Sequence, residues 1–577
     1  MSFFIEFNNI LLNCKRFMFW RIGGKNMKNK KHVLLALLAG TLATTTIGLA
    51  SCGPTSSPTG PSGDDNPTSV APDPDNPIFD ISNLVNDVEY EDDGVTPIFA
   101  GVEVKIWSII GDPDLSVLKN LIETFNMEHR GKIKMTLTSI GHSDFYNTLD
   151  TTWSLAPEDM PDLLLMHNEK TAEYAHKGML CPLDSIMEEF NYTIDTTQIY
   201  ENIDRGQTYL GKRFGLPVDA HGYLTHFRQD IIKKNGLGFD DNTRFIPQTR
   251  AEYQGLLESL KEKANSSEGL LVRNILKGAD HSWRKVNPSN FFPEFNQSTD
   301  PDGLGALYAN GGRMASEDGK TILFHENEGF KTYLTDIVDR WNNKLMGEPG
   351  TNVEGFSQGN CVIFPEGPWW TSLNYDPNMN IKELRVDDDG TWETAGKGLG
   401  VSEEDATDPV ISRPMVAMNT AGFWTLEENM SLPTATSWYG NGHAFSITRN
   451  CESATTALAS LEFAKWYTQG KDDDGHYHLA KWATGGHIPA WKNVFADEHY
   501  QEVHQNDLTL RALGDPQKVI AMEPLPYEKT IFDAVATAVN GVIMGCKGGT
   551  VLTHEDALVW LEETASSAQT ALDMLFW

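Results

Sequence analysis

The stretch VEVKIW at residues 102–107 begins a regular alternation of predicted strands and helices, and this alternation decides the fold class. Its apolar and polar side chains alternate with a period of two, as in a strand that buries one face. An amphipathic helix is predicted at 115–129, a strand at 133–139, a helix at 143–155 and a fully apolar strand, DLLLM, at 162–166. Strands that alternate with helices predict an open, mostly parallel α/β sheet, which binds ligands at the carboxyl ends of its strands.

The rest of the chain continues with further strands and helices in a less regular order. Strands are predicted at 223–227 and 443–448, a hairpin turn at 316–320, and helices at 250–264, 328–342, 453–469, 530–544 and 554–574. We find no internal repeat. A chain of 577 residues with 40% hydrophobic residues can form two or three domain-sized cores.

The charge of the chain is strongly negative. The formal charge is −34, and because residues 1–51 hold seven basic residues and one acidic residue, the part from Cys52 onward is near −40. Such a field repels polyphosphates and anionic membrane surfaces, and no basic stripe offsets it. The composition therefore argues against nucleic acid as a partner.

The N-terminal region carries an export pattern that ends at Cys52. MKNKK at 27–31 is a positive segment, an apolar segment follows at 33–39, and the small residues Leu49-Ala50-Ser51 precede Cys52. The pattern resembles the lipobox of bacterial lipoproteins. This resemblance implies that residues 27–51 are a signal peptide, that Cys52 is diacylated, and that the protein is held on the outer face of the cytoplasmic membrane. Two acyl chains give stable anchoring, and the broken apolar segment is too short for a span of about 20 residues.

Two segments around the signal peptide are expected to have no fold. Residues 1–26 precede a good start at Met27 and match no leader, so we interpret them as a mis-assigned start. Residues 52–78 hold the anchor cysteine and a linker rich in Pro, Ser, Gly and Asp. With almost nothing to bury, this linker should be a disordered spacer between membrane and body.

The cysteines give no sign of a metal or redox centre. Beyond Cys14 and Cys52, the chain has Cys181, Cys361, Cys451 and Cys546, with no CxxC and no Cys/His ligand spacing. A disulfide remains an open alternative, but four cysteines in so long a chain are more typical of small buried hydrophobic residues. We expect no metal and no cofactor.

Several motifs, in order from Gly101 onward, resemble the extracellular solute-binding proteins of ABC importers, in the branch of maltose and multiple-sugar binders. They are LIETFN at 121–126, PDL at 161–163 with GMLCPLD at 178–184, GLPVD at 215–219 with FRQD at 227–230, and FSQGN at 356–360 running into EGPW at 366–369. The chain departs from the family at Arg228-Gln229, where the family has Asn-Lys. Apparent insertions near 240–290 and 375–440 leave the ligand open.

The resemblance implies a two-lobed α/β fold of the periplasmic-binding-protein type (class II), whose sheets are joined by crossing strands that act as a hinge. Lobe one would comprise 101–217 plus 443–520, and lobe two 218–442 plus 521–577. The resemblance also implies a monomer, without enzymatic activity, that captures a carbohydrate between the lobes. The expected ligand is an oligosaccharide, and the expected partners are the permease subunits of an ABC importer.

A sugar presents apolar ring faces and hydroxyl edges, so its site needs flat aromatic side chains and hydrogen-bonding carboxylates or amides. By resemblance, Trp369 and its neighbour Trp370 are placed to stack on a sugar, and Asp219 is placed to accept its hydroxyls. Each has an alternative role, in core packing for the tryptophans and as a solvated hinge charge for Asp219. Further candidates at strand ends or in aromatic positions are Asp112, His167, Asn168, Phe291, Phe292, Trp438 and Phe532.

Other functions remain as alternatives. An exported glycoside hydrolase would need two carboxylates across a sugar, and no local pattern singles out such a pair. The GxSxG, HExxH, P-loop and GxGxxG motifs are absent. The ligand could instead be a glycerophosphodiester, a polyamine or a peptide, and a surface adhesin could use the same fold without transport.

We expect Trp369→Ala to weaken sugar binding far more than it weakens folding, because a stacking ring contacts the ligand rather than the core. The measurement is sugar affinity together with the melting temperature of the ligand-free protein. A loss of melting temperature with unchanged affinity would instead place Trp369 in the core.

Overall fold

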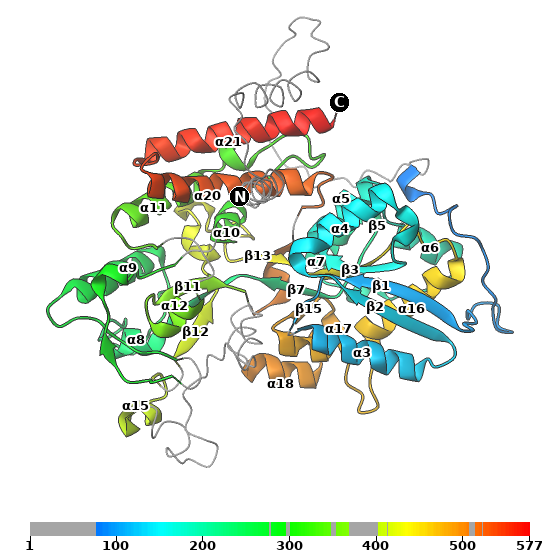
Figure 1. Cartoon of the computed structure of the whole chain (residues 1–577), viewed down its shortest axis with the longest axis horizontal. Helices are drawn as coiled ribbons and strands as arrows, with labels where there is room; N and C mark the ends of the chain where they lie inside the picture. The colour runs from blue at the N-terminus through cyan, green and yellow to red at the C-terminus, as the bar shows by residue number, and fades with distance from the viewer. Residues whose placement is uncertain are drawn as a thin grey trace, which may run out of the picture. The chain divides into compact units, whose positions relative to one another are not determined.

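The computed structural model describes residues 77–112, 114–275, 279–295, 301–347, 353–367, 402–411, 414–506, 514–521 and 523–576 (Figure 1). All of them fall within one compact unit of the chain, Ser69–Trp577. Cys52, Trp369 and Trp370 lie outside the described residues.

Four strands from the first half of the described chain and one later strand, β14, build a five-stranded sheet in the order β2-β1-β3-β14-β6. Its strands are β1 (Val102–Ser108), β2 (Ile133–Ser139), β3 (Leu163–His167), β6 (Leu216–Pro217) and β14 (His443–Ile447). β1 pairs in parallel with β2 and β3, whereas β14 is antiparallel to both β3 and β6. The sheet is therefore mixed: the consecutive βα units are parallel, as predicted, and the returning strand enters it from the opposite direction.

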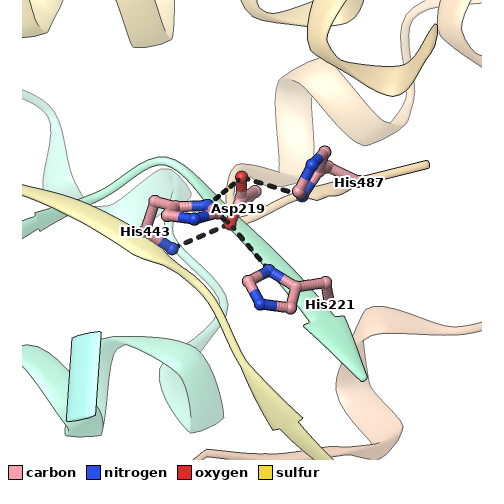
Figure 2. Close-up of side chains that lie close together, drawn as sticks. All are labelled: Asp219, His221, His443 and His487. Carbon is pink, nitrogen blue, oxygen red and sulfur yellow. Dashed lines mark hydrogen bonds and ion pairs between the residues drawn. The ribbon is translucent and has the colours of Figure 1, made fainter. Parts of the chain in front are cut away.

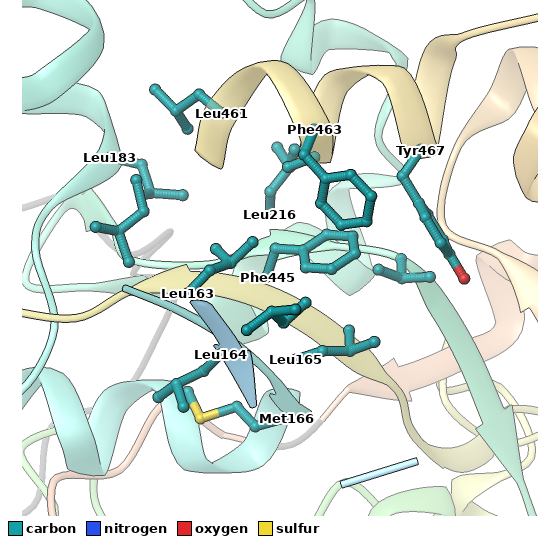
Figure 3. Packing of buried hydrophobic residues seen from close by; sticks show 14 of the residues in the cluster. Leu163, Leu164, Leu165, Met166, Leu183, Leu216, Phe445, Leu461, Phe463 and Tyr467 are labelled. Carbon is teal, nitrogen blue, oxygen red and sulfur yellow. The ribbon is translucent and has the colours of Figure 1, made fainter. Parts of the chain in front are cut away.

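Helices cover this sheet and complete a first hydrophobic core. β3 is buried on both faces, which explains its unbroken apolar sequence, and Figure 3 shows its side chains beside Phe445 of β14 and Phe463, whose rings lie 5.5 Å apart. The contributing helices are α3 (Asp114–Glu128), α4 (His142–Leu155), α5 (Thr171–His176), α6 (Leu183–Glu189), α7 (Glu201–Asp204), α16 (Ala454–Gln469), α17 (Lys492–Phe495) and α18 (Glu498–Asn506).

A second hydrophobic core forms around a three-stranded antiparallel sheet in the order β11-β8-β12. The strands are β8 (Leu224–Arg228), β11 (Ile363–Glu366) and β12 (Met415–Met418), and the helices are α8 (Gln229–Lys234), α9 (Arg250–Asn265), α10 (Pro301–Ala309), α11 (Glu328–Asn342), α20 (Glu528–Gly548) and α21 (His554–Leu575). α11 shows why these segments are helical. It buries Phe330, Leu334, Ile337 and Val338 at helical spacing along one side, and the side chain of Asn327 caps its first turn.

The remaining strands and α-helices of the described chain are short. They are the strand pair β4 (Thr208–Tyr209) and β5 (Lys212–Arg213), the pair β9 (Leu271–Val272) and β10 (Arg284–Lys285), and the helices α12 (Val353–Gln358) and α15 (Glu403–Thr407).

A four-stranded sheet, in the order β15-β7-β13-β16, joins the two cores. Its strands are β7 (Asp219–Gly222), β13 (Trp438–Asn441), β15 (Ile488–Pro489) and β16 (Val519–Ala521), and Figure 1 shows β7 and β13 running between the two groups of elements. Neighbouring residues of β13 point to opposite faces, so that Trp438 packs in the first core and Tyr439 in the second. Gly222 permits this packing, because a Cβ there would lie 2.4 Å from the Trp438 ring.

The predicted elements agree with the structure within a few residues. The strand at 133–139 and the helix at 328–342 are confirmed residue for residue. The hairpin at 316–320 is a tight turn closed by a single bridge, Ala315 to Ile322.

The four cysteines of the folded unit, Cys181, Cys361, Cys451 and Cys546, are buried and free. The alternative of a disulfide among them is therefore not realised in the structure, and they act as small apolar residues. Among the described residues, no helix combines the length and the apolar character needed to cross a membrane.

Candidate functional site

A cavity of about 620 Å³ lies where residues of both cores meet. From the first core it is lined by the loop after β1, the start of α4, the end of β3 and α5. The second core contributes Leu304 of α10 and the first turn of α20, while β7, β13 and the start of β14 form part of the wall. The cavity lies at the carboxyl ends of the parallel strands β1 and β3, which is where a sheet of this kind binds ligands.

Aromatic side chains reach the cavity from three directions. Tyr146 comes from α4, Tyr223 directly follows β7, and Phe532 lies on α20; each is half-buried. Tyr174 and Tyr439 also line the cavity but are almost fully buried. Half-buried rings can offer a flat apolar face to a ligand while their other atoms stay packed.

The charges that line the cavity are mostly negative. Seven carboxylates and two lysines are among its lining residues: Asp112, Asp114, Asp150, Glu169, Glu173, Glu528, Asp533, Lys170 and Lys529. No arginine occurs among the described lining residues. This balance favours a neutral or cationic ligand over an anionic one.

A buried ion pair connects the two cores beside the cavity. Lys170, in the 3-10 turn η3 (Asn168–Lys170), contacts the carboxylate of Glu528 on α20, and these side chains are 11% and 1% exposed. Glu173 lies 3.6 Å from the Lys170 ammonium and accepts a hydrogen bond of 3.2 Å from the backbone N–H of Lys529. These contacts tie η3 and α5 to the start of α20.

Burial and neighbouring charges shift the pKa values of Lys170, Glu528 and the nearby Glu169. Burial raises the pKa of Glu528, against the attraction of Lys170. Burial would lower the pKa of Lys170, but Glu528, Glu169 and Glu173 outweigh it and raise that pKa. Burial also acts to raise the pKa of Glu169, yet His167 and Lys170 lower it to about 2. Lys170 is therefore held as the cation among these carboxylates.

The floor of the cavity is a cluster of imidazoles around the buried carboxylate of Asp219 (Figure 2). The Asp219 side chain accepts hydrogen bonds from the backbone N–H of His443 (2.8 Å) and from the indole N–H of Trp482. Nδ1 of His443 and Nδ1 of His487 lie 2.9 Å and 3.2 Å from its Oδ2, and Nδ1 of His221 lies 3.6 Å from its Oδ1. Asp219 itself does not line the cavity, whereas the three imidazoles do.

The cluster shifts the pKa values of its four members in different directions. Burial would raise the pKa of Asp219, but His443 and His487 hold it well below its usual value. Burial lowers the pKa of His221 to about 3 and also lowers that of His443. For His487 burial is outweighed by Asp219 and Asp114, which raise its pKa. His487 is thus the imidazole favoured as the cation opposite Asp219.

The structure brings three of the sequence candidates to the cavity wall. They are Asp112 in the loop after β1, His167 at the end of β3, and Phe532 on α20. Asp219 and Asn168 lie directly behind the wall, 0% and 2% exposed. Asp219 therefore positions the imidazoles of the floor, and the predicted solvated hinge charge is not what the structure shows.

Three aromatic candidates lie elsewhere. Trp438 is 2% exposed in the first core and Phe291 is fully buried in the second. Phe292 packs against a small separate cluster around Phe295. None of the three lines the cavity, so we leave them out of the proposed site.

Most of the residues that line the cavity could not be predicted from the sequence. Among them are His142, Tyr146, Glu169, Lys170, Glu173, His221, His443, His487 and Glu528. One signal was available in Asp219-Ala220-His221: residues two apart on a strand share a face, so these two side chains had to be neighbours. His443 and His487 carry no comparable signal, because they arrive from distant segments.

Comparison with known proteins supports the fold. No family model and no curated protein matches the sequence. Solved structures do resemble it, among them an ABC substrate-binding protein from Listeria monocytogenes in complex with cycloalternan, with 14% identity, a TM-score of 0.56 and coverage of 82% of this chain and 99% of the other. The sugar-binding protein MalE from Xanthomonas citri has 15% identity, a TM-score of 0.56 and coverage of 82% and 98%. UgpB from Mycobacterium tuberculosis in complex with glycerophosphocholine has 13% identity, a TM-score of 0.55 and coverage of 82% and 98%.

At such identities the likeness shows the fold alone. The chain has the two-lobed periplasmic-binding-protein fold, which confirms the predicted fold class. In this fold the two lobes correspond to the two hydrophobic cores described above, and the cavity lies between residues of both.

We expect Lys170→Met to move the two lobes apart. Removing one partner of a buried ion pair costs up to ~3–5 kcal/mol, because Glu528 must then either stay charged without a counter-charge or take up a proton. Separation of the lobes relieves this cost by admitting water. The radius of gyration from small-angle X-ray scattering should therefore increase without ligand. Glu528→Gln in the same chain should reverse part of that increase.

The matched control is Lys134→Met, which removes a lysine from a pair whose side chains are 69% and 53% exposed. Because exposed pairs contribute little, its scattering should equal that of the unmodified protein. An unchanged radius for Lys170→Met would show that this ion pair does not hold the lobes together.

Proposed function

We propose that this protein is a lipid-anchored substrate-binding protein that captures a carbohydrate between its two lobes and delivers it to an ABC importer. The observation that carries the proposal is the cavity of about 620 Å³, lined by aromatic rings and carboxylates from both lobes. Its size falls in the range of about 300–1,000 Å³ that small-molecule sites occupy.

The aromatic rings suit the apolar faces of a sugar. Tyr146 belongs to one lobe and Phe532 to the other, so a ring bound between them would gain contacts from both only when the lobes are closed. Tyr223 adds a third half-buried ring at the crossover. By sequence resemblance, Trp369 and Trp370 would add stacking surfaces to the same site.

The polar groups suit the hydroxyl edge of a sugar. Carboxylates accept hydrogen bonds from hydroxyls, and the side chains of Asn147 and Asn441 can both donate and accept. Asp112 and Asp114 lie after β1, at the sheet edge where such folds bind ligands. Neutral sugars keep their hydroxyls unionised, so a surplus of carboxylates does not repel them.

The mechanism is binding followed by hinge closure, without covalent chemistry. The crossing strands β7, β13 and β16 connect the lobes, so rotation about them would open and close the cavity. A ligand shifts this equilibrium only by its difference in affinity for the two states. The closed form would then be recognised by the permease subunits.

The export pattern places the protein on the outer face of the cytoplasmic membrane in this proposal. The anchor is a diacylated Cys52, and residues 53–76 form the spacer. The body is acidic and is repelled by an anionic membrane surface, which suits a protein that extends from the membrane on a linker.

A cationic solute, such as a polyamine, is the second candidate ligand. The surplus of carboxylates over lysines around the cavity favours it, and aromatic rings bind cations over their faces. A glycerophosphodiester fits less well, since its phosphate would meet these carboxylates with no arginine among the described lining residues.

The test is a thermal-shift screen of the chain from residue 53 onward against mono- and oligosaccharides, polyamines, glycerophosphodiesters and peptides. A ligand at 100 times its dissociation constant should add about 2.7 kcal/mol to stability. Stabilisation by a sugar without its consumption supports the proposal. Consumption of the sugar would point to a hydrolase, stabilisation by another class would redefine the solute, and no response would favour the adhesin.

For the sugar that stabilises the protein, Phe532→Ala should weaken binding about tenfold, which corresponds to ~1.4 kcal/mol. The ring lines the cavity from the second lobe and would lose its contact with the ligand. Isothermal titration calorimetry measures the change. Phe576→Ala is the matched control, because Phe576 is 37% exposed and does not line the cavity. Equal affinities for the two variants would remove Phe532 from the site.

Cys52→Ala should release the protein from the membrane fraction, since no thiol would remain for acylation. Cell fractionation followed by immunoblotting measures the distribution between membrane and soluble fractions. Cys14→Ala is the control and should change nothing, because Cys14 precedes the expected start at Met27. Retention of the Cys52→Ala variant at the membrane would argue against the lipoprotein interpretation.

A further inference from the structure

Four metal-ligand side chains converge in the floor of the cavity, and no sugar-binding role requires this arrangement. Asp219, His221, His443 and His487 each offer a ligand atom, and these atoms all lie within 4.8 Å of one another. The four residues are 0%, 6%, 5% and 3% exposed. Figure 2 shows the imidazoles turned toward the Asp219 carboxylate from separate segments of the chain.

The spacing fits a small tetrahedral ion. Zinc binds nitrogen and oxygen ligands at about 2.0–2.1 Å, so tetrahedral ligands stand about 3.3 Å apart. The Asp219 Oδ2 atom lies 2.9 Å from Nδ1 of His443 and 3.2 Å from Nδ1 of His487, close to the tetrahedral distance. Nδ1 of His221 lies 3.6 Å from the other oxygen, Oδ1, and all four ligand atoms lie within 4.8 Å of one another, so small side-chain shifts would bring them around one ion.

The type of ligand selects the class of ion. Three imidazoles and one carboxylate suit zinc and its neighbours among the first-row transition metals. Calcium and magnesium instead take mostly oxygen ligands, which this cluster supplies only through Asp219.

The surroundings of the cluster have the features of an outer shell. The Nε2 atom of His487 lies 3.2 Å from Asp114, which forms a carboxylate–imidazole pair behind a ligand. Trp482 donates its indole N–H to Asp219 and orients the carboxylate. Such partners fix ring orientation and raise ligand basicity in metal sites. A divalent ion would also neutralise the negative charge of the two carboxylates, Asp219 and Asp114.

We propose that Asp219, His221, His443 and His487 form a binding site for a divalent transition-metal ion of the zinc class. With four protein ligands the site is closed, so its role is structural rather than catalytic. The ion would join β7, the start of β14 and the residue before β15, which pairs with β7. It would thereby hold in place the crossing strands and the imidazoles that line the cavity floor. This inference does not rest on the proposed carbohydrate, because the site binds its ion without a sugar.

The experiment uses the chain from residue 53 onward, which contains the whole compact unit, after removal of metal with a chelator. Zinc added to it should remain at one ion per chain through gel filtration, as measured by elemental analysis, and should raise the melting temperature. Cobalt in place of zinc should give the intense visible absorption of a tetrahedral site. His443→Ala and His487→Ala should each weaken zinc binding at least about a hundredfold, since loss of an outer-shell partner alone costs about 10–100-fold.

Two control variants test whether histidines outside the cluster contribute to zinc binding. His142→Ala removes an imidazole that lines the same cavity outside the cluster, and His554→Ala removes one that is 55% exposed on its side chain. Both should keep full zinc affinity. Where His443→Ala or His487→Ala fails to fold, the cobalt spectrum of the unmodified chain decides alone. No retained zinc, an octahedral cobalt spectrum, or equal affinity in all folded variants would overturn the proposal.

Discussion

The buried carboxylate of Asp219 is the constraint around which the rest of the site is arranged. It is fully excluded from solvent, so it must receive hydrogen bonds and positive charge from other segments. The backbone and ring of His443, the indole of Trp482 and the ring of His487 supply them. Because these groups come from different segments, satisfying one carboxylate fixes where the crossover strands meet and which imidazoles form the cavity floor.

The second constraint is the uneven charge of the cavity. Its carboxylates outnumber its lysines, and Lys170 is held among Glu169, Glu173 and Glu528. The acidic character of the whole chain therefore continues into the cavity, which a net charge alone could not have shown. The lysine also links η3 of one lobe to α20 of the other. Electrostatics thus connects the ligand site to the relative position of the two lobes.

The sequence was most informative where structure depends on local periodicity. The alternation of apolar side chains in β2 and the helical spacing in α11 predicted both elements residue for residue. Aromatic content was less informative: Phe532 lines the cavity, whereas Trp438 and Phe291 lie in the two cores. A ring that stacks on a ligand and a ring that packs in a core are equally hydrophobic, so composition cannot separate them.

By itself, the sequence determined the α/β character and the acidic charge, because these follow from short-range patterns and from composition. The two-lobed fold was expected only from the resemblance of its motifs to those of a known family. Only the tertiary structure decided which side chains share a site. Asp219 and His221 are neighbours on one strand, but His443 and His487 reach them only after the chain has passed through the second core and returned. The ligand site is therefore a product of long-range packing, since burial and hydrogen bonding select partners by position in space and not by distance along the chain.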